Sequence, residues 1–183
     1  INKLLGAPVY SSVKPSIRAL KLSLLFLSGS FVCTPAVSAS SVEATPSFDA
    51  STASNLVKHF YSLLDVAKYE EGILDDVVTK DFQIFESRRI MDLASFHDYL
   101  THTDPNADPL VKTSWTLTSF KVSLDSHSAH LSYQNHGEFT HGRSMNVSIK
   151  WMESAYIILE NSKPKIKFIN VNLISKKVDK LSS

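Results

Sequence analysis

The sequence predicts one α+β domain in which helices precede a sheet of long strands. Up to residue 100, apolar side chains recur at helical spacing, and after residue 113 four long runs are rich in strand-forming residues. Short segments of turn-forming residues separate these runs, and strands joined by short turns pair as an antiparallel meander. Helices that come before such a meander pack on one face of the sheet.

The composition is that of an ordinary globular domain. The chain has 183 residues, of which 43% are hydrophobic and 20% are charged, enough for one domain whose core needs no disulfide or structural metal. Residues 1–39 hold four basic residues and no acidic one, and the rest of the chain holds 15 basic and 18 acidic residues. A mildly acidic domain without a basic stripe argues against nucleic acid as a partner.

Residues 1–39 are predicted to be a signal peptide that is removed after Ala39. Basic residues precede an apolar run over residues 22–32, which is too short to span a bilayer because a spanning helix needs about 20 apolar residues. Thr34 and Pro35 end this run, and small residues at Val37 and Ala39 suit a cleavage site.

Export follows from this prediction. The mature protein begins at Ser40, is periplasmic or secreted, and has no stable membrane insertion. Cys33 is the only cysteine and lies within the removed segment, so the mature protein has no thiol chemistry and no disulfide. The alternatives are an uncleaved anchor and a lipid attached to Cys33.

The mature chain divides into three parts. We expect a flexible lead-in over residues 40–54, one domain over residues 55–178 and a tail over residues 179–183. Helices are expected over residues 55–67, 69–78 and 93–100, the last with Asp92 as its N-cap. Strands are expected over residues 82–86, 114–124, 129–140, 143–159 and 165–175.

Three stretches share their order and local pattern with a known superfamily. They are residues 56–86 (LVKHFYSLLDVAKYEEGILDDVVTKDFQIFE), 148–161 (SIKWMESAYIILEN) and 165–175 (KIKFINVNLIS). Together they resemble the NTF2-like superfamily, in its SnoaL-like and ketosteroid-isomerase-like branches. The resemblance implies a cone: a strongly curved, mainly antiparallel sheet wrapped by N-terminal helices, with a pocket at the open end. Its members include isomerases, cyclases, dehydratases and non-catalytic binding domains, so the fold does not fix the function.

Glu86 is the residue that the resemblance implies as a catalytic base. In the isomerase branch, a carboxylate at this place shuttles a proton. A carboxylate that follows Phe82 and Ile84 on an apolar strand is desolvated and therefore more basic than usual. The alternative is a solvent-facing carboxylate that pairs with Arg88 or Arg89.

Two aromatic positions bear on the same activity. The resemblance places Phe60 where the isomerases have a tyrosine that donates a hydrogen bond to the developing oxyanion, and phenylalanine cannot donate. Losing such a donor costs a hundredfold or more in rate. Tyr61 points about 100° away from Phe60 on a helix, which argues against a simple substitution. Tyr156 lies near a second donor position of the isomerases, or is an ordinary strand tyrosine.

The predicted pocket wall comes from helix one and the last two strands. Trp151 continues an inward-facing alternation through Met145, Val147 and Ile149. Asn170 and Asn172 share a predicted strand face with Ile166, and two amides on an apolar face need partners if they are buried. The predicted ligand-binding residues are His59, Phe60, Trp151, Asn170 and Asn172.

The sequence offers no support for a metal or a cofactor. His136, Glu138 and His141 cluster along the chain, but the first two lie on a polar strand face, and no spacing typical of metal ligands occurs. No phosphate loop, dinucleotide motif or nucleophile elbow is present.

Three functions remain open. The first is an exported domain that binds a small, largely apolar molecule in the cone. The second is a cofactor-independent isomerase, cyclase or dehydratase with Glu86 as general base, and the third is a non-catalytic interaction module. We also expect a homodimer, because four long strands present more sheet than the helices cover. The identity of the ligand is not encoded in any recognisable motif.

Overall fold

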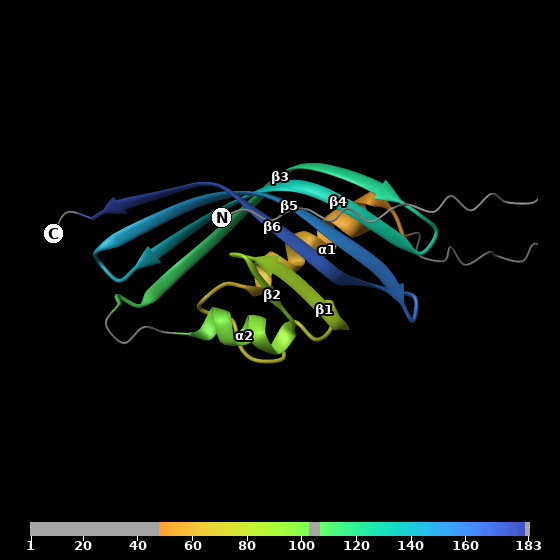
Figure 1. Cartoon of the computed structure of the whole chain (residues 1–183), viewed down its shortest axis with the longest axis horizontal. Helices are drawn as coiled ribbons and strands as arrows, with labels where there is room; N and C mark the ends of the chain where they lie inside the picture. Colours follow the sequence, from red (N-terminus) through yellow and green to blue (C-terminus); the bar gives the residue numbers. More distant parts are fainter. Residues whose placement is uncertain (1–47, 103–106, 182–183) are drawn as a thin grey trace, which may run out of the picture. The chain divides into compact units, whose positions relative to one another are not determined.

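Six strands form one mixed sheet, and two helices lie against it (Figure 1). The computed structural model describes residues 48–102 and 107–181. The elements, in chain order, are α1 (Ala50–Leu63), β1 (Val78–Glu86), β2 (Arg89–Met91), α2 (Leu93–Thr101), β3 (Leu110–Leu124), β4 (Ser128–His141), β5 (Met145–Glu160) and β6 (Lys163–Lys180). The strand order is β2-β1-β6-β5-β4-β3, in which only the β1–β6 pair is parallel. The predicted α+β class and the antiparallel meander are confirmed.

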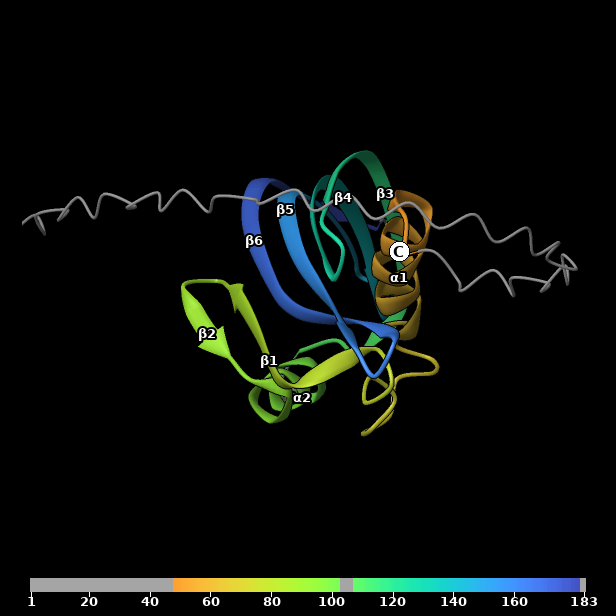
Figure 2. The same cartoon turned by 90° about the vertical axis from the view of Figure 1, so that its right-hand side faces the viewer.

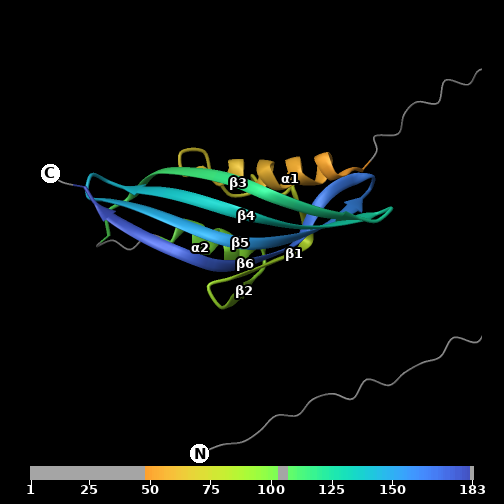
Figure 3. The ribbon, with the colours of Figure 1, turned by 90° about the horizontal axis from the view of Figure 1, so that it is seen from above.

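The sheet is strongly curved, and the helices lie on its concave side (Figure 2). Seen from above, α1 runs along the β3 side, whereas α2 lies on the β1 and β6 side (Figure 3). The ends of β4, β5 and β6 near His141, Met145 and Lys180 extend beyond both helices in Figures 1 and 3. We call this part of the sheet the open end. Its concave face has no helix over it among the described residues.

The helices differ from the prediction in their bounds and number. Helix α1 begins at Ala50, because the Asp49 carboxylate caps it by accepting a hydrogen bond from the Thr52 N–H at 2.7 Å. Helix α2 is confirmed, with Asp92 as its N-cap. The predicted helix over residues 69–78 is wrong. A series of turns occupies residues 71–77, and Gly72 has a φ of 84°, a conformation that glycine adopts readily and that ends a right-handed helix.

A bulge in β6 changes which of its residues face the core. Ile166 pairs with Ile157 and Phe168 pairs with Tyr156, so β6 gains one residue relative to β5 between these pairs. Ile166 and Ile169 are therefore both buried, although they are three residues apart. The predicted shared face of Ile166, Asn170 and Asn172 is wrong for this reason, since the two asparagines lie on the convex face.

The core fills the space between the helices and the covered half of the sheet. Phe60 of α1 is fully buried and stacks on Phe96 of α2, with ring centroids 6.3 Å apart. Phe82 of β1 closes this group at 6.0 Å from Phe60. Burying one such side chain contributes about 1.5–3 kcal/mol, so this trio fixes both helices and β1 to each other. No helix in the described part of the chain has the length and apolar character needed to cross a membrane.

Candidate functional site

A buried carboxylate lies at the centre of the concave face. Glu153 of β5 is 3% exposed and follows Trp151 in the strand alternation that points inward. Its Oε2 accepts a hydrogen bond from the Tyr61 hydroxyl of α1, and its Oε1 accepts one from Asn135 Nδ2 of β4 at 3.1 Å. Burial raises the pKa of Glu153, and the neighbouring donors Tyr61, Asn135 and Tyr133 oppose that rise.

Three buried polar atoms in this region have no partner within hydrogen-bond distance, although the Tyr133 hydroxyl lies near enough to Glu153 and Tyr61 to affect their pKa values. They are the Tyr133 hydroxyl, Asn135 Oδ1 and Trp115 Nε1. Tyr133 is the direct cross-strand neighbour of Glu153, and the Tyr61 ring lies 5.1 Å from Trp115 and 6.4 Å from Tyr133. Buried polar groups in folded proteins almost always have a partner. We call the five residues Tyr61, Trp115, Tyr133, Asn135 and Glu153 the inner polar cluster.

A second carboxylate, Glu86, belongs to the same face. Ile84 and Phe85 of β1 pair with Ile169 and Asn170 of β6, and continuing this register by one residue places Glu86 beside Val171. Val171 in turn pairs with Glu153. The two carboxylates are therefore two strands apart, about 10 Å by strand spacing. Burial raises the pKa of Glu86 to about 7, and the charge of Glu153 adds to the rise.

Neither carboxylate forms an ion pair with a described residue. Arg89 is the cross-strand partner of Glu86, but its guanidinium lies over the Tyr99 ring at 5.9 Å. The ion pair of Glu86 with Arg88 or Arg89, which the sequence left open, is absent from the described structure. Glu86 is half-buried on the face that Ile84 shares, as expected for a base in the cone, and its catalytic role stays a prediction.

Three aromatic rings, one of them that of Trp115 in the inner polar cluster, lie between Glu153 and the open end. The rings of Trp115, Phe139 and Trp151 lie with centroids 5.2–6.2 Å apart, and we call them the ring triad. Gly137 lies beneath them. A Cβ at this position would come within 2.8 Å of atoms of the Phe139 and Trp151 rings, so only glycine leaves room for the triad.

Beyond the ring triad, the concave face is open, and its β6 side carries both apolar side chains and the lysines Lys176 and Lys180, which pair with Ile149 and Met145 of β5. Leu173 and Val178 of β6 pair with Trp151 and Val147 of β5 and therefore share their face. Leu173 is 63% exposed and Val178 is 48% exposed. The concave face thus changes from exposed at the open end, where apolar side chains alternate with Lys176 and Lys180, to buried and polar at Glu153.

The other predicted site residues lie elsewhere. Trp151 lies on the concave face as expected, and Phe60 belongs to the core rather than to a polar site. His59 is exposed, with its Nδ1 3.4 Å from the Ser62 hydroxyl. Tyr156 is 37% exposed on the convex face. Asn170 and Asn172 lie on that face too, because of the bulge in β6.

The sequence reasoning missed the buried hydroxyl of Tyr61, the residue that follows Phe60. Tyr61 is 4% exposed, and its hydroxyl reaches Glu153, although the next residue along a helix points about 100° away. The signal for Glu153 was present, since it is the only acid in the alternation that the sequence assigned to the inner face of β5. Asn135 likewise continues the alternation of Leu131 and Tyr133.

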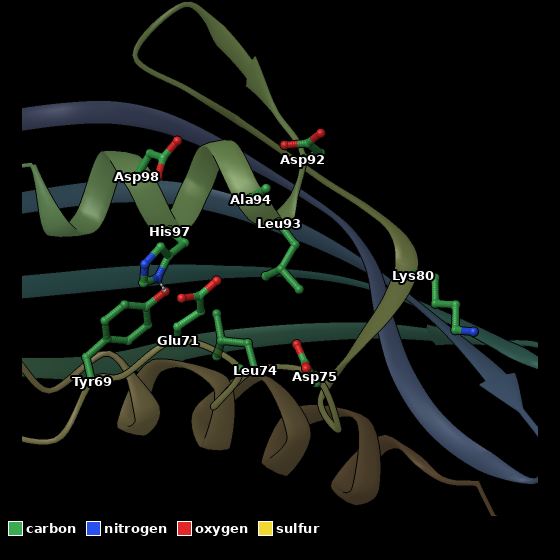
Figure 4. A pocket seen from close by; sticks show the side chains of 11 residues that line it. Tyr69, Glu71, Leu74, Asp75, Lys80, Asp92, Leu93, Ala94, His97 and Asp98 are labelled. Carbon is green, nitrogen blue, oxygen red and sulfur yellow. Dashed lines mark hydrogen bonds between the residues drawn. The ribbon is translucent and has the colours of Figure 1, made fainter.

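A separate groove lies outside the cone, between α2 and the turns that precede β1 (Figure 4). Its volume is about 430 Å³. The Tyr69 ring stacks on His97 with centroids 5.7 Å apart, and the Tyr69 hydroxyl lies 3.3 Å from His97 Nδ1 (Figure 4). Glu71, Asp75, Asp92 and Asp98 line the groove together with Lys80. In residues 48–102 and 107–181, no three His, Cys, Asp or Glu side chains converge as metal ligands would.

Comparisons with known proteins support the fold. No protein-family model and no curated protein matches the sequence. A putative scytalone dehydratase from Novosphingobium aromaticivorans matches over 69% of this chain and 85% of its own, with a TM-score of 0.59 and 9% identity. The Kfla4162 protein from Kribbella flavida matches over 69% and 91%, with a TM-score of 0.58 and 11% identity.

An assembly domain is similar to the same degree. The CaMKII hub of S. rosetta matches over 70% of this chain and 99% of its own, with a TM-score of 0.56 and 16% identity. At such identities the likeness concerns the fold alone, and proteins of this shape include putative enzymes and hubs. Residues 48–102 and 107–181 therefore have the NTF2-like fold, as the sequence patterns implied.

Proposed function

We propose that the chain is an exported domain that binds a small, largely apolar molecule on the concave face of its sheet. The observation that carries this proposal is the set of three unpartnered polar atoms around Glu153. An unpartnered buried polar group costs about 1–3 kcal/mol, and a ligand with one polar end supplies the missing partners.

The open end provides the approach. Exposed apolar side chains such as Leu173 lead along the concave face to the ring triad, and Glu153 follows Trp151 by two residues on the same face. The apolar body of the ligand would cover the open end, and its polar end would displace a ring of the triad to reach the inner polar cluster. Apolar pockets with a few convergent polar groups are typical of small-molecule sites.

Tryptophan fluorescence tests this proposal directly, because both tryptophans of the chain belong to the ring triad. We expect 2-phenylethanol to change the emission in a saturable way. Tyr133→Phe should weaken binding about tenfold, as expected for the loss of one buried hydrogen bond. Tyr156→Phe on the convex face is the matched control and should bind as the parent does. A parent protein that shows no saturable change with any small apolar probe would overturn the proposal.

A second function, acid–base catalysis, is favoured by one observation. Glu86 has a pKa of about 7, which is close to the optimum for a general base near neutral pH. Glu86→Gln keeps the shape and removes the proton acceptor. We expect turnover of an enolisable ketone, followed by proton exchange with deuterated water, to fall by orders of magnitude in this variant. Glu160→Gln, on the exposed β5–β6 hairpin, is the control, and equal exchange rates in all three proteins would exclude catalysis by Glu86.

Two further parts of the proposal concern the form in which the protein acts. We propose that export removes residues 1–39, which lie outside the described residues, and N-terminal sequencing of exported protein should begin at Ser40.

We also propose a homodimer formed through the convex face. Met152 is 46% exposed there, and Phe85 and Phe168 form an edge-to-face pair with centroids 4.8 Å apart on the same face. The similar hub domain indicates that this fold also serves assembly.

A further inference from the structure

We propose that the polar end of the ligand is an organic ammonium group, which Glu153 and the amide oxygen of Asn135 receive, while the more distant Glu86 adds negative charge to the site. This inference rests on the proposed binding function and names the chemical class of its ligand. It depends on three features of the site: two carboxylates without an ion-pair partner among the described residues, an unused acceptor beside Glu153, and the faces of the aromatic rings.

The two carboxylates make the site negative. Buried charges in proteins are normally paired or bound to a metal, yet no described basic side chain pairs with Glu86 or Glu153. Two basic groups of neighbouring elements stack on aromatic rings instead, and Lys176, which shares the concave face, lies beyond Trp151 toward the open end. Arg89 lies over Tyr99 and Lys58 lies over Phe120, at 5.9 Å and 5.3 Å from the ring centroids.

A bound cation would relieve the main electrostatic cost of the site. Burial disfavours the charged form of both carboxyl groups, and each disfavours the charge of the other. A cation held at Glu153 favours the charged form of that carboxyl strongly and that of Glu86, about 10 Å away by strand spacing, more weakly. A ligand carboxylate or phosphate would add a third negative charge, so the site selects against anions.

The amide oxygen of Asn135 can accept a hydrogen bond from a donor on the ligand. Asn135 is 1% exposed, and its Nδ2 already donates to Glu153. This hydrogen bond fixes the orientation of the amide, because Oδ1 cannot donate to the carboxylate, and it leaves Oδ1 free as an acceptor beside the same carboxylate. An ammonium group has three donors and no acceptor, so it matches Asn135 Oδ1 and Glu153 together.

The aromatic residues favour the same class of ligand. The faces of tryptophan and tyrosine rings attract cations, with a gain of about 0.5–2 kcal/mol. Tyr61 and Trp115 lie 5.1 Å apart next to Glu153, and the ring triad continues this wall toward the open end. The Trp115 N–H is a donor and does not contact an ammonium group, so it is left for water or for another polar atom of the ligand.

Three probes with one apolar body separate the charge classes. We would titrate the whole protein with 2-phenylethylamine, 2-phenylethanol and phenylacetate by calorimetry. At about pH 8, where the Glu86 carboxyl is ionised, the amine should bind at least about tenfold more tightly than the alcohol, and phenylacetate should bind most weakly. At about pH 5.5 the amine stays protonated but the Glu86 carboxyl gains its proton, so the advantage of the amine should shrink.

Substitutions assign the effect to the site. Glu86→Gln should abolish the pH dependence of the amine preference, and Glu153→Gln should reduce the preference itself at both pH values. Glu138→Gln, whose side chain is 64% exposed on the convex face of β4, is the control and should change neither. Circular dichroism checks that each variant is folded, and Glu86→Gln, at a half-buried position, carries the test if Glu153→Gln does not fold.

The outcomes are distinct. If the amine and the alcohol bind equally, or phenylacetate binds most tightly, the ammonium inference is wrong while the proposed binding function stands. If none of the three probes binds, the proposed function fails and the inference fails with it.

Discussion

The Tyr61 hydroxyl of α1 donates a hydrogen bond to the Glu153 carboxylate of β5, across 92 residues of sequence. Both side chains are buried, at 4% and 3% exposure. The contact joins the first helix to the centre of the sheet and at the same time orients the carboxylate that the proposed site uses. Structure and proposed function therefore depend on the same pair of atoms.

Removing the Tyr61 hydroxyl should destabilise the domain. Tyr61→Phe keeps the ring contacts with Trp115 and leaves Glu153 with one donor fewer, so we expect the free energy of unfolding to fall by about 1–3 kcal/mol. Urea denaturation followed by circular dichroism measures this change. Tyr69→Phe is the control, since the Tyr69 hydroxyl lies in the partly open groove and its loss should cost less than about 1 kcal/mol. Equal decreases in the free energy of unfolding in the two variants would show that the hydrogen bond of Tyr61 is no more stabilising than that of Tyr69.

Stability should decrease as the pH rises from about 4.5 to about 7. The pKa of Glu86 is raised from 4.5 in the unfolded chain to about 7 in the folded protein, because burial disfavours the carboxylate. The folded state therefore binds more protons than the unfolded state over this window, and the stabilisation present below pH 4.5 is lost as the pH passes through 7. The raised pKa of Glu153 acts in the same direction.

Denaturation curves at several pH values test this expectation. A single carboxyl group contributes a slope of at most about 1.4 kcal/mol per pH unit. Glu86→Gln should flatten the slope, whereas Glu138→Gln on the convex face should not. A parent protein whose stability rises between about pH 5 and pH 7 would contradict the assigned direction.

The sequence predicted the sheet better than the site. Hydrophobic alternation and turn residues located β3, β4, β5 and β6 within a few residues, because strands with one buried face repeat with period two. The predicted helix over residues 69–78 is wrong because its apolar spacing has another origin. Leu74 and Val77 are buried within a series of turns, and Val78 begins β1. One bulge in β6 places Asn170 and Asn172 on the convex face. The sequence contains no pattern that predicts a bulge of this kind.

Only part of the inner polar cluster could be predicted from the sequence. Glu153 and Asn135 were identifiable, since each is a polar residue in an apolar alternation. Their partner Tyr61 was not, because the rotation of α1 on the sheet decides whether Phe60 or Tyr61 points at β5, and both are buried in the result. Long-range packing fixed this choice.

Gly137→Ala should disturb the ring triad. The added Cβ meets atoms of the Phe139 and Trp151 rings at 2.8 Å, closer than carbon atoms pack, so the rings must move. We expect a loss of about 1–3 kcal/mol in the free energy of unfolding and a changed tryptophan emission spectrum. Trimming one of the two rings in Gly137→Ala/Phe139→Leu should recover part of the loss. If Gly137→Ala has parental stability and emission, the triad is not packed as described.

The final prediction concerns the convex face. Met152 lies on this face opposite Asn172 and Gln134, and it is 46% exposed in the single chain. A homodimer through the sheet would bury it, and a carboxylate there would be desolvated without a partner. Met152→Glu should therefore convert a dimer to a monomer in light scattering at micromolar concentration.

Ile90→Glu is the control, because Ile90 is more exposed, at 67%, but lies on the β1–β2 hairpin at the edge of the sheet. It should leave the dimer intact. A parent protein that is monomeric under the same conditions would refute the dimer, and dissociation by Ile90→Glu with a dimeric Met152→Glu would move the interface to the hairpin.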